Sequence, residues 1–233
     1  MKPGKIIVFE GLDYSFKETN SKKLFQYIKE NITEKVILLS FPNYESDSSY
    51  FVKRYLNGDY GNDVDEYKAS IFYLVDRYDT IIKENINQLI EEGYIIILDR
   101  YTGSNLIFQT AKIDKNSSNE IESNVKKMKF IKWVKDMEYN IFNLPKENVV
   151  IYMNMPLEVS YELMKQRKLK NNEDNDIHED NKKFLEIVEN NALSIANSNL
   201  WNIVNCTDNE LNIKDENTIF NEVLDVVKKY ITN

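Results

Sequence analysis

The sequence has few of the residues on which several protein classes depend: one cysteine, one histidine, four prolines and six glycines in 233 residues. Cys206, being alone, excludes an intramolecular disulfide, and nothing near His178 makes a nucleophilic or metal-binding set with it, so we assign it no catalytic role. No apolar stretch approaches the roughly 20 residues that a membrane span needs. No segment of signal-peptide form precedes the first apolar run. These absences predict a cytoplasmic protein that does not bind membranes.

Positive charge is also in short supply, because 30 Lys and Arg residues face 38 Asp and Glu residues and the net charge is −8. A protein that binds nucleic acid must neutralise backbone phosphates, so this balance argues against nucleic acid as a partner. Small anionic ligands stay compatible with it if basic residues gather locally. Hydrophobic residues make up 42% of the chain, enough for a sizeable core.

Five short apolar runs punctuate the chain, at residues 5–9, 35–41, 94–98, 149–153 and 201–205. Continuous apolar runs of this length are typical of parallel strands buried on both faces. Helical patterns separate them, at residues 20–32, 47–56, 65–92, 104–113, 120–143, 157–166, 179–197 and 215–231. There is no internal repeat and no change of composition. The pattern predicts one α/β domain, residues 1–233, with a five-stranded parallel sheet flanked by helices.

Two of the predicted helices have long apolar stripes that we expect to be buried. The stripe of 65–92 consists of Ile71, Leu74, Val75, Tyr78, Ile81 or Ile82, Ile86 and Leu89. The stripe of 120–143 consists of Ile121, Val125, Met128, Ile131, Val134 and Ile141.

The loop after the first strand has the frame of a phosphate-binding loop, Gly-x-x-x-x-Gly-Lys-Ser/Thr. Gly11 and Lys17 are six residues apart, as that motif requires, but Phe16 stands at the second glycine and Glu18 at the hydroxyl residue. In such loops the backbone N–H groups wrap phosphates, the lysine reaches the outer phosphates and the hydroxyl holds Mg²⁺. A strand, a turn and a helix with an unrelated lysine is the simpler explanation of this match taken alone.

Charged residues mark the end of the third strand, where Asp99-Arg100-Tyr101 follows the apolar run. Ligands of open α/β sheets bind outside the carboxyl ends of the strands, so we interpret this pair as functional rather than structural. Further along, a basic cluster around Arg167 precedes the polar stretch 171–176, which we expect to be a mobile surface loop. Solvation of the helix end is the simpler explanation for the lysines of that cluster, which are Lys165, Lys168 and Lys170.

Several short motifs follow one another in a specific order and spacing along nearly the whole chain. They are Phe9-Glu10-Gly11-x-Asp13, Phe41-Pro42-Asn43-Tyr44, Asp76-Arg77-Tyr78, Asp99-Arg100-Tyr101 with Ser104-Asn105 and Gln109, Leu144-Pro145, and Asp176-Ile177-His178-Glu179. Together they resemble the thymidylate kinases, a family of P-loop nucleoside monophosphate kinases. The resemblance implies a three-layer P-loop NTPase fold, a lid at about 165–180, a homodimer, and transfer of the γ-phosphoryl group of ATP to dTMP with Mg²⁺.

The same resemblance assigns roles to individual residues. It implies that Lys17, Asp99, Arg100 and Arg167 are catalytic, with Asp99 serving the metal. It places ATP at Gly11, Lys17 and Thr19. The implied dTMP site consists of Asp13, Phe41, Tyr73, Arg77, Arg100, Ser104, Asn105 and Gln109.

Tyr73 and Arg77 are four residues apart and so share one helix face. The resemblance implies that the ring of Tyr73 stacks on a pyrimidine while the guanidinium of Arg77 bonds the base carbonyl. For an isolated helix we would favour a different interpretation, in which Tyr73 belongs to the apolar stripe and Arg77 pairs with a surface carboxylate such as Asp76 or Asp79. The surrounding motifs outweigh that interpretation here.

The departures from the family lie in the first loop. If the replaced glycine had a positive φ, Phe16 adopts a conformation that costs about 1–2 kcal/mol, and its ring occupies space meant for phosphate oxygens. Glu18 adds negative charge but can itself ligate Mg²⁺. Thr19 is rotated by about 100° from it, so we expect its hydroxyl to point away from the site that Glu18 faces.

Three functions follow from these residues. The leading hypothesis is a dTMP kinase. The second is a weak or inactive nucleotide-binding relative that keeps its monophosphate pocket, since only the donor loop is altered. A GTPase lacks support because the Asn-Lys-x-Asp motif that recognises guanine is missing from the sequence.

Overall fold

The computed structural model describes residues 3–61, 63–171 and 181–231, with the backbone alone for 168–171. Its centre is a five-stranded sheet in the order β2-β3-β1-β4-β5, with every neighbouring pair parallel. The strands are β1 (Lys5–Glu10), β2 (Val36–Ser40), β3 (Ile95–Asp99), β4 (Val149–Asn154) and β5 (Asn202–Asn205). The predicted parallel sheet is therefore confirmed, strand by strand.

The apolar runs of the three central strands are continuous because β1, β3 and β4 bury both faces. In β1, Ile7 and Phe9 pack with Leu24 and Ile28 on one side of the sheet, while Ile6 and Val8 join a separate buried cluster on the other. Successive side chains of a strand point to opposite faces, so in a strand covered on both sides every side chain is buried and apolar residues are favoured at every position.

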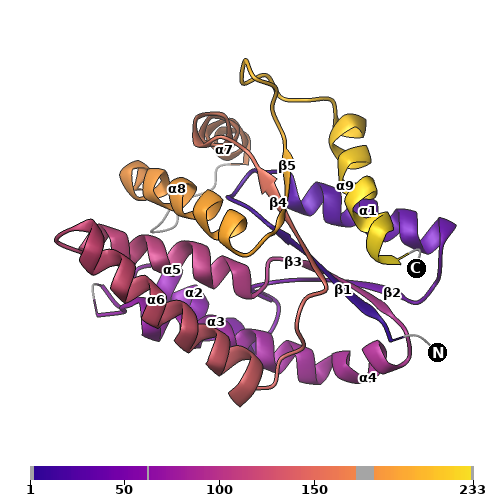
Figure 1. The fold of residues 1–233 in the computed structure, drawn as a ribbon, viewed down its shortest axis with the longest axis horizontal. Coiled ribbons are helices and arrows are strands. Elements are labelled where there is room, and N and C mark those ends of the chain that lie inside the picture. Colours follow the sequence, from indigo (N-terminus) through magenta and orange to yellow (C-terminus); the bar gives the residue numbers. More distant parts are fainter. Residues whose placement is uncertain (1–2, 62, 172–180, 232–233) are drawn as a thin grey trace.

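Helices cover the sheet on both faces and give three layers (Figure 1). One face is covered by α1 (Lys17–Asn31) and α9 (Glu216–Ile231). The other layer contains α3 (Glu66–Lys83), α4 (Ile86–Glu91), α5 (Thr102–Asn116), α6 (Glu120–Asp136) and α8 (Lys182–Ser198). The short α2 (Tyr50–Leu56) follows a 3₁₀ turn, η1 (Asp47–Ser49), and a π-helical turn, η2 (Met137–Ile141), extends α6.

Side chains at the predicted boundaries explain where helices begin. Asp65 accepts a hydrogen bond from the Lys68 N–H (2.9 Å) at the start of α3, and Asn119 accepts one from the Glu122 N–H (3.0 Å) at the start of α6. Each satisfies an N–H group that has no partner within the helix.

The helix predicted over 65–92 is two helices, so that prediction is wrong in its continuity. Asn85 adopts a left-handed conformation (φ 52°) between α3 and α4. Asparagine tolerates this conformation better than most residues, and the apolar periodicity runs on past it, which hides the break. The turn brings Ile86 into the core, where it is fully buried.

The predicted stripes are also only partly buried. In α3, Val75 and Tyr78 are exposed, and Ile81 rather than Ile82 is the buried one of that pair. In the 120–143 region Val134 alone among the stripe residues is fully buried. The exposed members of the second stripe are Ile121, Val125, Met128 and Ile141. Each of these helices presents an apolar face to solvent.

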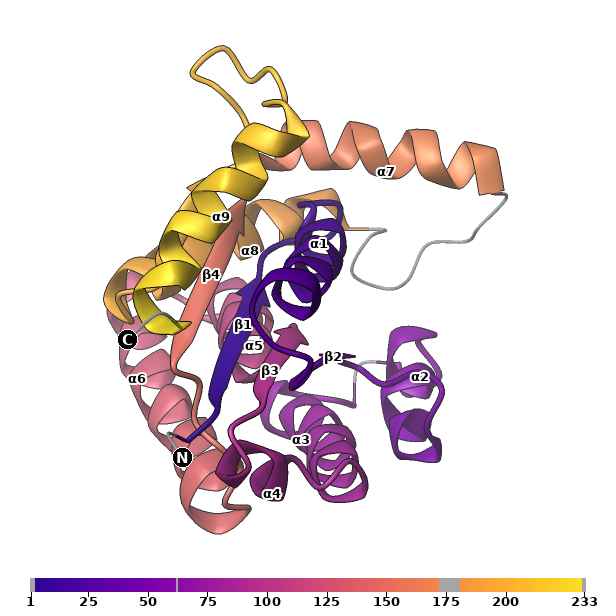
Figure 2. The same cartoon turned by 90° about the vertical axis from the view of Figure 1, so that its right-hand side faces the viewer.

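The carboxyl ends of the strands gather at one end of the molecule. Figure 2 shows α7 (Leu157–Asn171) lying across that end, close to the start of α1. β1 lies between β3 and β4 in the sheet. The connection from β1 leads to β2 on one side and the connection from β3 leads to β4 on the other, so the strand order changes direction beside β1. Parallel sheets bind ligands at such a point. No helix of the described ranges has the length and apolarity to cross a membrane.

Candidate active site

The loop after β1 can be built only with glycine at its first position. Gly11 has φ 154°, and a Cβ added there would lie 2.8 Å from the backbone oxygen of Met153. Any side chain would therefore push β1 away from β4. Its carbonyl oxygen lies 3.1 Å from Arg100 Nη1, which joins the loop to the end of β3.

Phe16 adopts the left-handed conformation expected of a residue that replaces glycine, with φ 62°, and Tyr14 does the same with φ 59°. The expectation that the Phe16 ring occupies space meant for phosphate oxygens stays a prediction, since Phe16 borders the cavity over the loop. The ring is half-buried and packs against the buried cluster formed by β1, α1 and α9, and a cavity stays open beside it. Apolar packing of the ring offsets the backbone strain.

Lys17 opens α1 and is 6% exposed. Its Nζ donates to the carbonyl oxygen of Leu12 (2.5 Å) and lies 3.4 Å from Ser15 Oγ. Burial, with the positive charge of Arg100, lowers the pKa of Lys17 to about 8. The ammonium is thus charged at neutral pH and borders the cavity above the loop.

Glu18 and Thr19 both border that cavity. The direction of the Thr19 hydroxyl, away from the site that Glu18 faces, stays a prediction. Glu18 bonds Lys22 one turn along (2.5 Å), and this hydrogen bond lowers the pKa of Glu18. The carboxylate is ionised and exposed.

Arg100 follows β3 and is fixed at both ends. Its N–H donates to the Phe9 carbonyl (2.9 Å), and its guanidinium donates to Ser104 Oγ (3.2 Å) and to Asp13. Burial alone would lower the pKa of Arg100, but the surrounding carboxylates raise it above its usual value. The residue is a fixed cation at the carboxyl edge of the sheet.

Asp99 precedes it and is 9% exposed. Burial raises the pKa of Asp99, and Lys17 and Arg100 act against that rise. Its Oδ1 is buried without a hydrogen-bond partner among the described residues. A carboxylate oxygen of this kind suits a hard cation such as Mg²⁺. Over the described ranges no three His, Cys, Asp or Glu side chains gather into a metal site, so water and phosphate oxygens would have to complete the coordination.

Glu10 is a site residue to which the sequence assigned no role. It is fully buried at the end of β1 and accepts hydrogen bonds from the Tyr101 N–H (2.9 Å), the Ser104 N–H (3.0 Å) and Ser104 Oγ (2.6 Å). Burial raises the pKa of Glu10 to about 7, although Ser104 and Arg100 favour the ionised form. The sequence did contain a signal for this role, since Glu10 is a charged residue at the end of an otherwise apolar strand.

One cavity collects all the predicted dTMP-binding residues, and we call it the acceptor cavity. Its lining includes Asp13, Phe41, Tyr73, Arg77, Arg100, Ser104, Asn105 and Gln109, together with Pro42, Tyr44, Leu56, Asp76, Tyr101 and Phe108. The residues come from the loop after β1, from the segment after β2, from α2 and α3, and from β3 into α5. Gln109 Oε1 is buried there without a partner in the described part of the chain.

A second cavity lies over the altered loop, and we call it the donor cavity. It is lined by Asp13–Thr19, Ser40–Pro42, Tyr44, Asp99, Arg100, Leu163 and Arg167. The guanidinium of Arg167 lies 5.9 Å from the ring centroid of Tyr14. All four predicted catalytic residues border this cavity. It shares Asp13, Phe41, Pro42, Tyr44 and Arg100 with the acceptor cavity.

Arg77 pairs with neither of the surface carboxylates considered for an isolated helix. It forms a buried ion pair with Glu138, a residue of η2 that lies 61 positions away. Asp76 instead accepts hydrogen bonds from the Asn43 N–H and from Ser48 Oγ. Tyr73 is half-buried and borders the acceptor cavity.

The family model described as thymidylate kinase matches residues 9–217, most of the chain. The chain belongs to the thymidylate kinase family. It is 29% identical to a thymidylate kinase of Plasmodium falciparum over 155 residues, which cover 66% of this chain and 63% of that protein. It is 26% identical to a human thymidylate kinase over 156 residues, which cover 66% of this chain and 62% of that protein.

Several of these matches cover only part of the relative, since the aligned stretch spans 63% of the Plasmodium protein and 53% of a Caenorhabditis elegans thymidylate kinase. Among solved structures, the thymidylate kinase of Candida albicans superimposes with a TM-score of 0.71 at 21% identity, covering 97% of this chain and 92% of that one. This likeness establishes the fold alone, and it confirms the predicted P-loop NTPase architecture.

Other predicted features lie apart from the site or outside the described residues. Cys206 is buried, with Sγ 3.6 Å from the Ser15 carbonyl oxygen. The predicted lid begins on α7, which continues to Asn171. His178 and residues 172–176 of the predicted mobile loop lie outside the described residues.

Proposed function

We propose that the protein is a thymidylate kinase that transfers the γ-phosphoryl group of ATP to dTMP, giving dTDP. The observation that carries this proposal is the pair of adjoining cavities. The acceptor cavity contains every predicted dTMP-binding residue, the donor cavity is lined by Lys17 and Thr19 of the predicted ATP site but not by Gly11, and Arg100 and Asp13 border both. A nucleotide in each cavity would bring its phosphates to the shared wall.

The acceptor cavity suits a pyrimidine with ring carbonyls and a ring N–H. Tyr73 offers an aromatic face for stacking. The partnerless Oε1 of Gln109 can accept from the N3–H of thymine. Arg77 supplies donors for a base carbonyl.

Phosphoryl transfer needs positioning and charge stabilisation rather than covalent chemistry by the protein. Arg100 is placed to hold the acceptor phosphate, because its fork can bind two phosphate oxygens. Lys17 and Arg167 line the donor cavity, where their charges would stabilise the γ-phosphoryl group. Mg²⁺, when bound, neutralises charge on the ATP phosphates, and Asp99 with its partnerless Oδ1 would hold it or its waters.

The proposal also includes a homodimer and a cytoplasmic location. The exposed apolar face of α3 supports the homodimer, since surface patches of this kind mark association sites. The cytoplasmic location stays a prediction from the composition.

Separate calorimetric titrations of dTMP and of ATP–Mg²⁺ test the function, with dTDP formation measured in parallel. We expect dTMP to bind, and Arg100→Ala to weaken it by about 2–5 kcal/mol because a buried charge contact is lost. Arg54→Ala is the matched control, since Arg54 pairs with Asp59 at the surface. No dTMP binding at millimolar concentration would overturn the proposal. Binding without dTDP formation would favour the inactive relative.

A further inference from the structure

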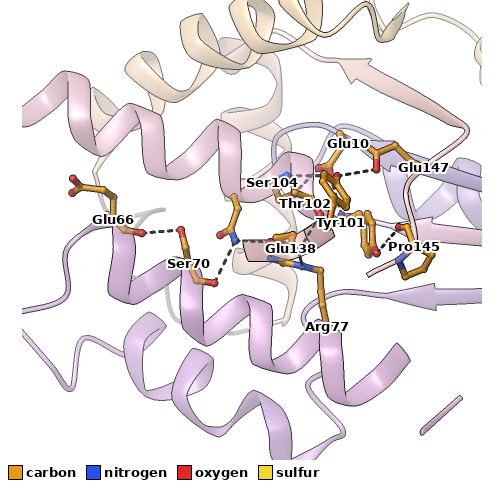
Figure 3. A network of polar contacts seen from close by, with 12 residues as sticks. Glu10, Glu66, Ser70, Arg77, Tyr101, Thr102, Ser104, Glu138, Pro145 and Glu147 are labelled. Carbon is orange, nitrogen blue, oxygen red and sulfur yellow. Dashed lines mark hydrogen bonds and ion pairs between the residues drawn. The ribbon is translucent and has the colours of Figure 1, made fainter. Parts of the chain in front are cut away.

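Glu138 is a buried carboxylate that faces four donors. It lies in η2, is 1% exposed, and follows Gln109, the last acceptor-cavity residue in the sequence, by 29 positions. Arg77 donates to it through Nε (3.0 Å) and Nη2, Thr102 through Oγ1 (3.1 Å), and Asn105 through Nδ2 (3.3 Å). Figure 3 shows this carboxylate between α3 and the start of α5.

Three of these four donor groups belong to two residues that line the acceptor cavity, Arg77 and Asn105, while Glu138 does not line it. Arg77 is held through Nε and Nη2, which fixes the plane of the guanidinium and leaves Nη1 outside the pair. Asn105 Nδ2 lies between Glu138 and the carbonyl oxygen of Ser70 (3.4 Å), so its amide orientation is fixed as well. One carboxylate therefore orients two side chains of the cavity wall.

The contact between Glu138 and Arg77 depends on both the length and the charge of the glutamate, so a shorter or a neutral side chain cannot reproduce it. Arginine has several rotatable bonds, and a buried guanidinium needs a carboxylate in bidentate contact to keep one orientation. Glutamine would place an amide N–H₂ against a guanidinium that has only donors, so one of the two contacts with Arg77 would be lost.

We propose that Glu138 is a positioning residue that sets the preference of the acceptor cavity among pyrimidine monophosphates. It does so by fixing the guanidinium of Arg77 so that Nη1, the nitrogen outside the ion pair, donates toward a base with a carbonyl at C4. The inference rests on the proposed function and deepens it.

The chemistry of the bases gives the expected direction. Thymine has a carbonyl oxygen at C4, which accepts from a guanidinium, whereas cytosine has an amino group there, which donates. When two donors face each other, neither has a hydrogen-bond partner. A site that donates to a carbonyl at C4 therefore rejects a base with an amino group there. A guanidinium free to rotate discriminates less, because it can turn away from the cytosine amino group.

Calorimetric dissociation constants for dTMP and dCMP test this inference without requiring catalysis. For Glu138→Gln we expect the ratio of the dCMP constant to the dTMP constant to fall on the order of tenfold from the wild-type ratio, the effect of one charge-assisted hydrogen bond. A merely structural defect would weaken both ligands alike and leave the ratio unchanged. Glu147→Gln is the matched control: it makes the same chemical change at a nearby carboxylate whose partner is the Tyr139 hydroxyl (2.9 Å), and it should keep the ratio.

Two further variants complete the test. Glu138→Asp keeps the charge, guards against a glutamine variant that does not fold, and should also lower the ratio because the shorter side chain reaches Arg77 less well. Adding Glu138→Gln to Arg77→Gln should lower the ratio no further, since Glu138 acts through Arg77.

An unchanged ratio in both Glu138→Gln and Glu138→Asp would overturn the inference while leaving the proposed function in place. So would a wild-type protein that binds dTMP and dCMP equally. Failure of the wild type to bind dTMP at all would instead overturn the proposed function.

Discussion

At the scale of single residues, the altered phosphate loop combines strain with packing. Phe16 and Tyr14 both have positive φ, a conformation that costs a non-glycine residue about 1–2 kcal/mol. The strain persists because the Phe16 ring packs against the core. Lys17 meanwhile bonds the loop's own carbonyl at Leu12, so a phosphate has to draw its ammonium away.

Restoring the common loop residues tests whether these features limit activity. Phe16→Gly with Glu18→Thr removes the strain and returns a hydroxyl next to the phosphates, so we expect the rate of dTDP formation to rise by at least about tenfold, equivalent to about 1.4 kcal/mol of barrier. Steady-state rates for wild type and double variant decide the matter. Asn85→Gly is the control, because it places glycine at another position of positive φ that borders neither cavity, and it should leave the rate unchanged. An unchanged or lower rate in the double variant would mean that the loop has adapted, with Glu18 serving Mg²⁺.

Glu10 predicts a dependence of stability on pH. Its pKa is raised from 4.5 to about 7 in the folded protein, so between these values the folded state holds a proton that the unfolded state has released. The contribution of Glu10 to the free energy of unfolding is therefore complete below pH 4.5. It is lost as the pH rises from 4.5 through 7, by up to about 3 kcal/mol.

Urea unfolding of wild type and Glu10→Gln from pH 4.5 to 7.5 measures this contribution. We expect the difference in unfolding free energy between the two proteins to change across that range in favour of the variant as the pH rises. A difference that stays constant would show that Glu10 remains ionised, held by the donors of Tyr101 and Ser104.

At the scale of elements, the strands were predictable to within one or two residues and the layout of the site with them. Continuous apolar runs ending at residues such as Pro42 and Asp99 leave little choice of structure. The break at Asn85 was not predictable from periodicity, because the apolar pattern crosses it unchanged. Glu138 was also beyond reach, since its partner Arg77 is 61 residues away and no local pattern links them.

The junction between α3 and α4 offers a test of how Asn85 shapes these elements. Asn85→Ala should destabilise the protein by about 1–2 kcal/mol, because alanine tolerates φ 52° poorly. Asn85→Gly should be close to wild type, since glycine takes that conformation without steric cost. Chemical denaturation of the three proteins makes the comparison. Equal stability of the alanine and glycine variants would contradict a role for the left-handed turn.

At the scale of the whole molecule, the site is assembled from segments spread over most of the chain, whereas the surface carries apolar groups that the fold leaves uncovered. Tyr78, Ile82 and Ile141 border a single groove between α3 and η2, and their exposed fractions are 40%, 53% and 61%. The sequence predicted Tyr78 and Ile141 to be buried, with Ile82 as the alternative to Ile81, which is the buried one of the two. A second subunit would bury them, which reconciles their periodicity with their exposure.

This arrangement yields a prediction about assembly. Light scattering coupled to size-exclusion chromatography should give the mass of two 27.6 kDa chains for the wild type. Ile82→Lys should shift the mass toward that of one chain, because a buried unpaired lysine opposes association. Leu200→Lys is the matched control: Leu200 is 89% exposed and lies outside that groove, so the dimer should persist. A wild-type monomer would contradict the predicted dimer. A dimer that survives Ile82→Lys would exclude the α3 face and direct attention to Ile121, Val125 and Met128 on α6, the other exposed apolar stripe in the described part of the chain.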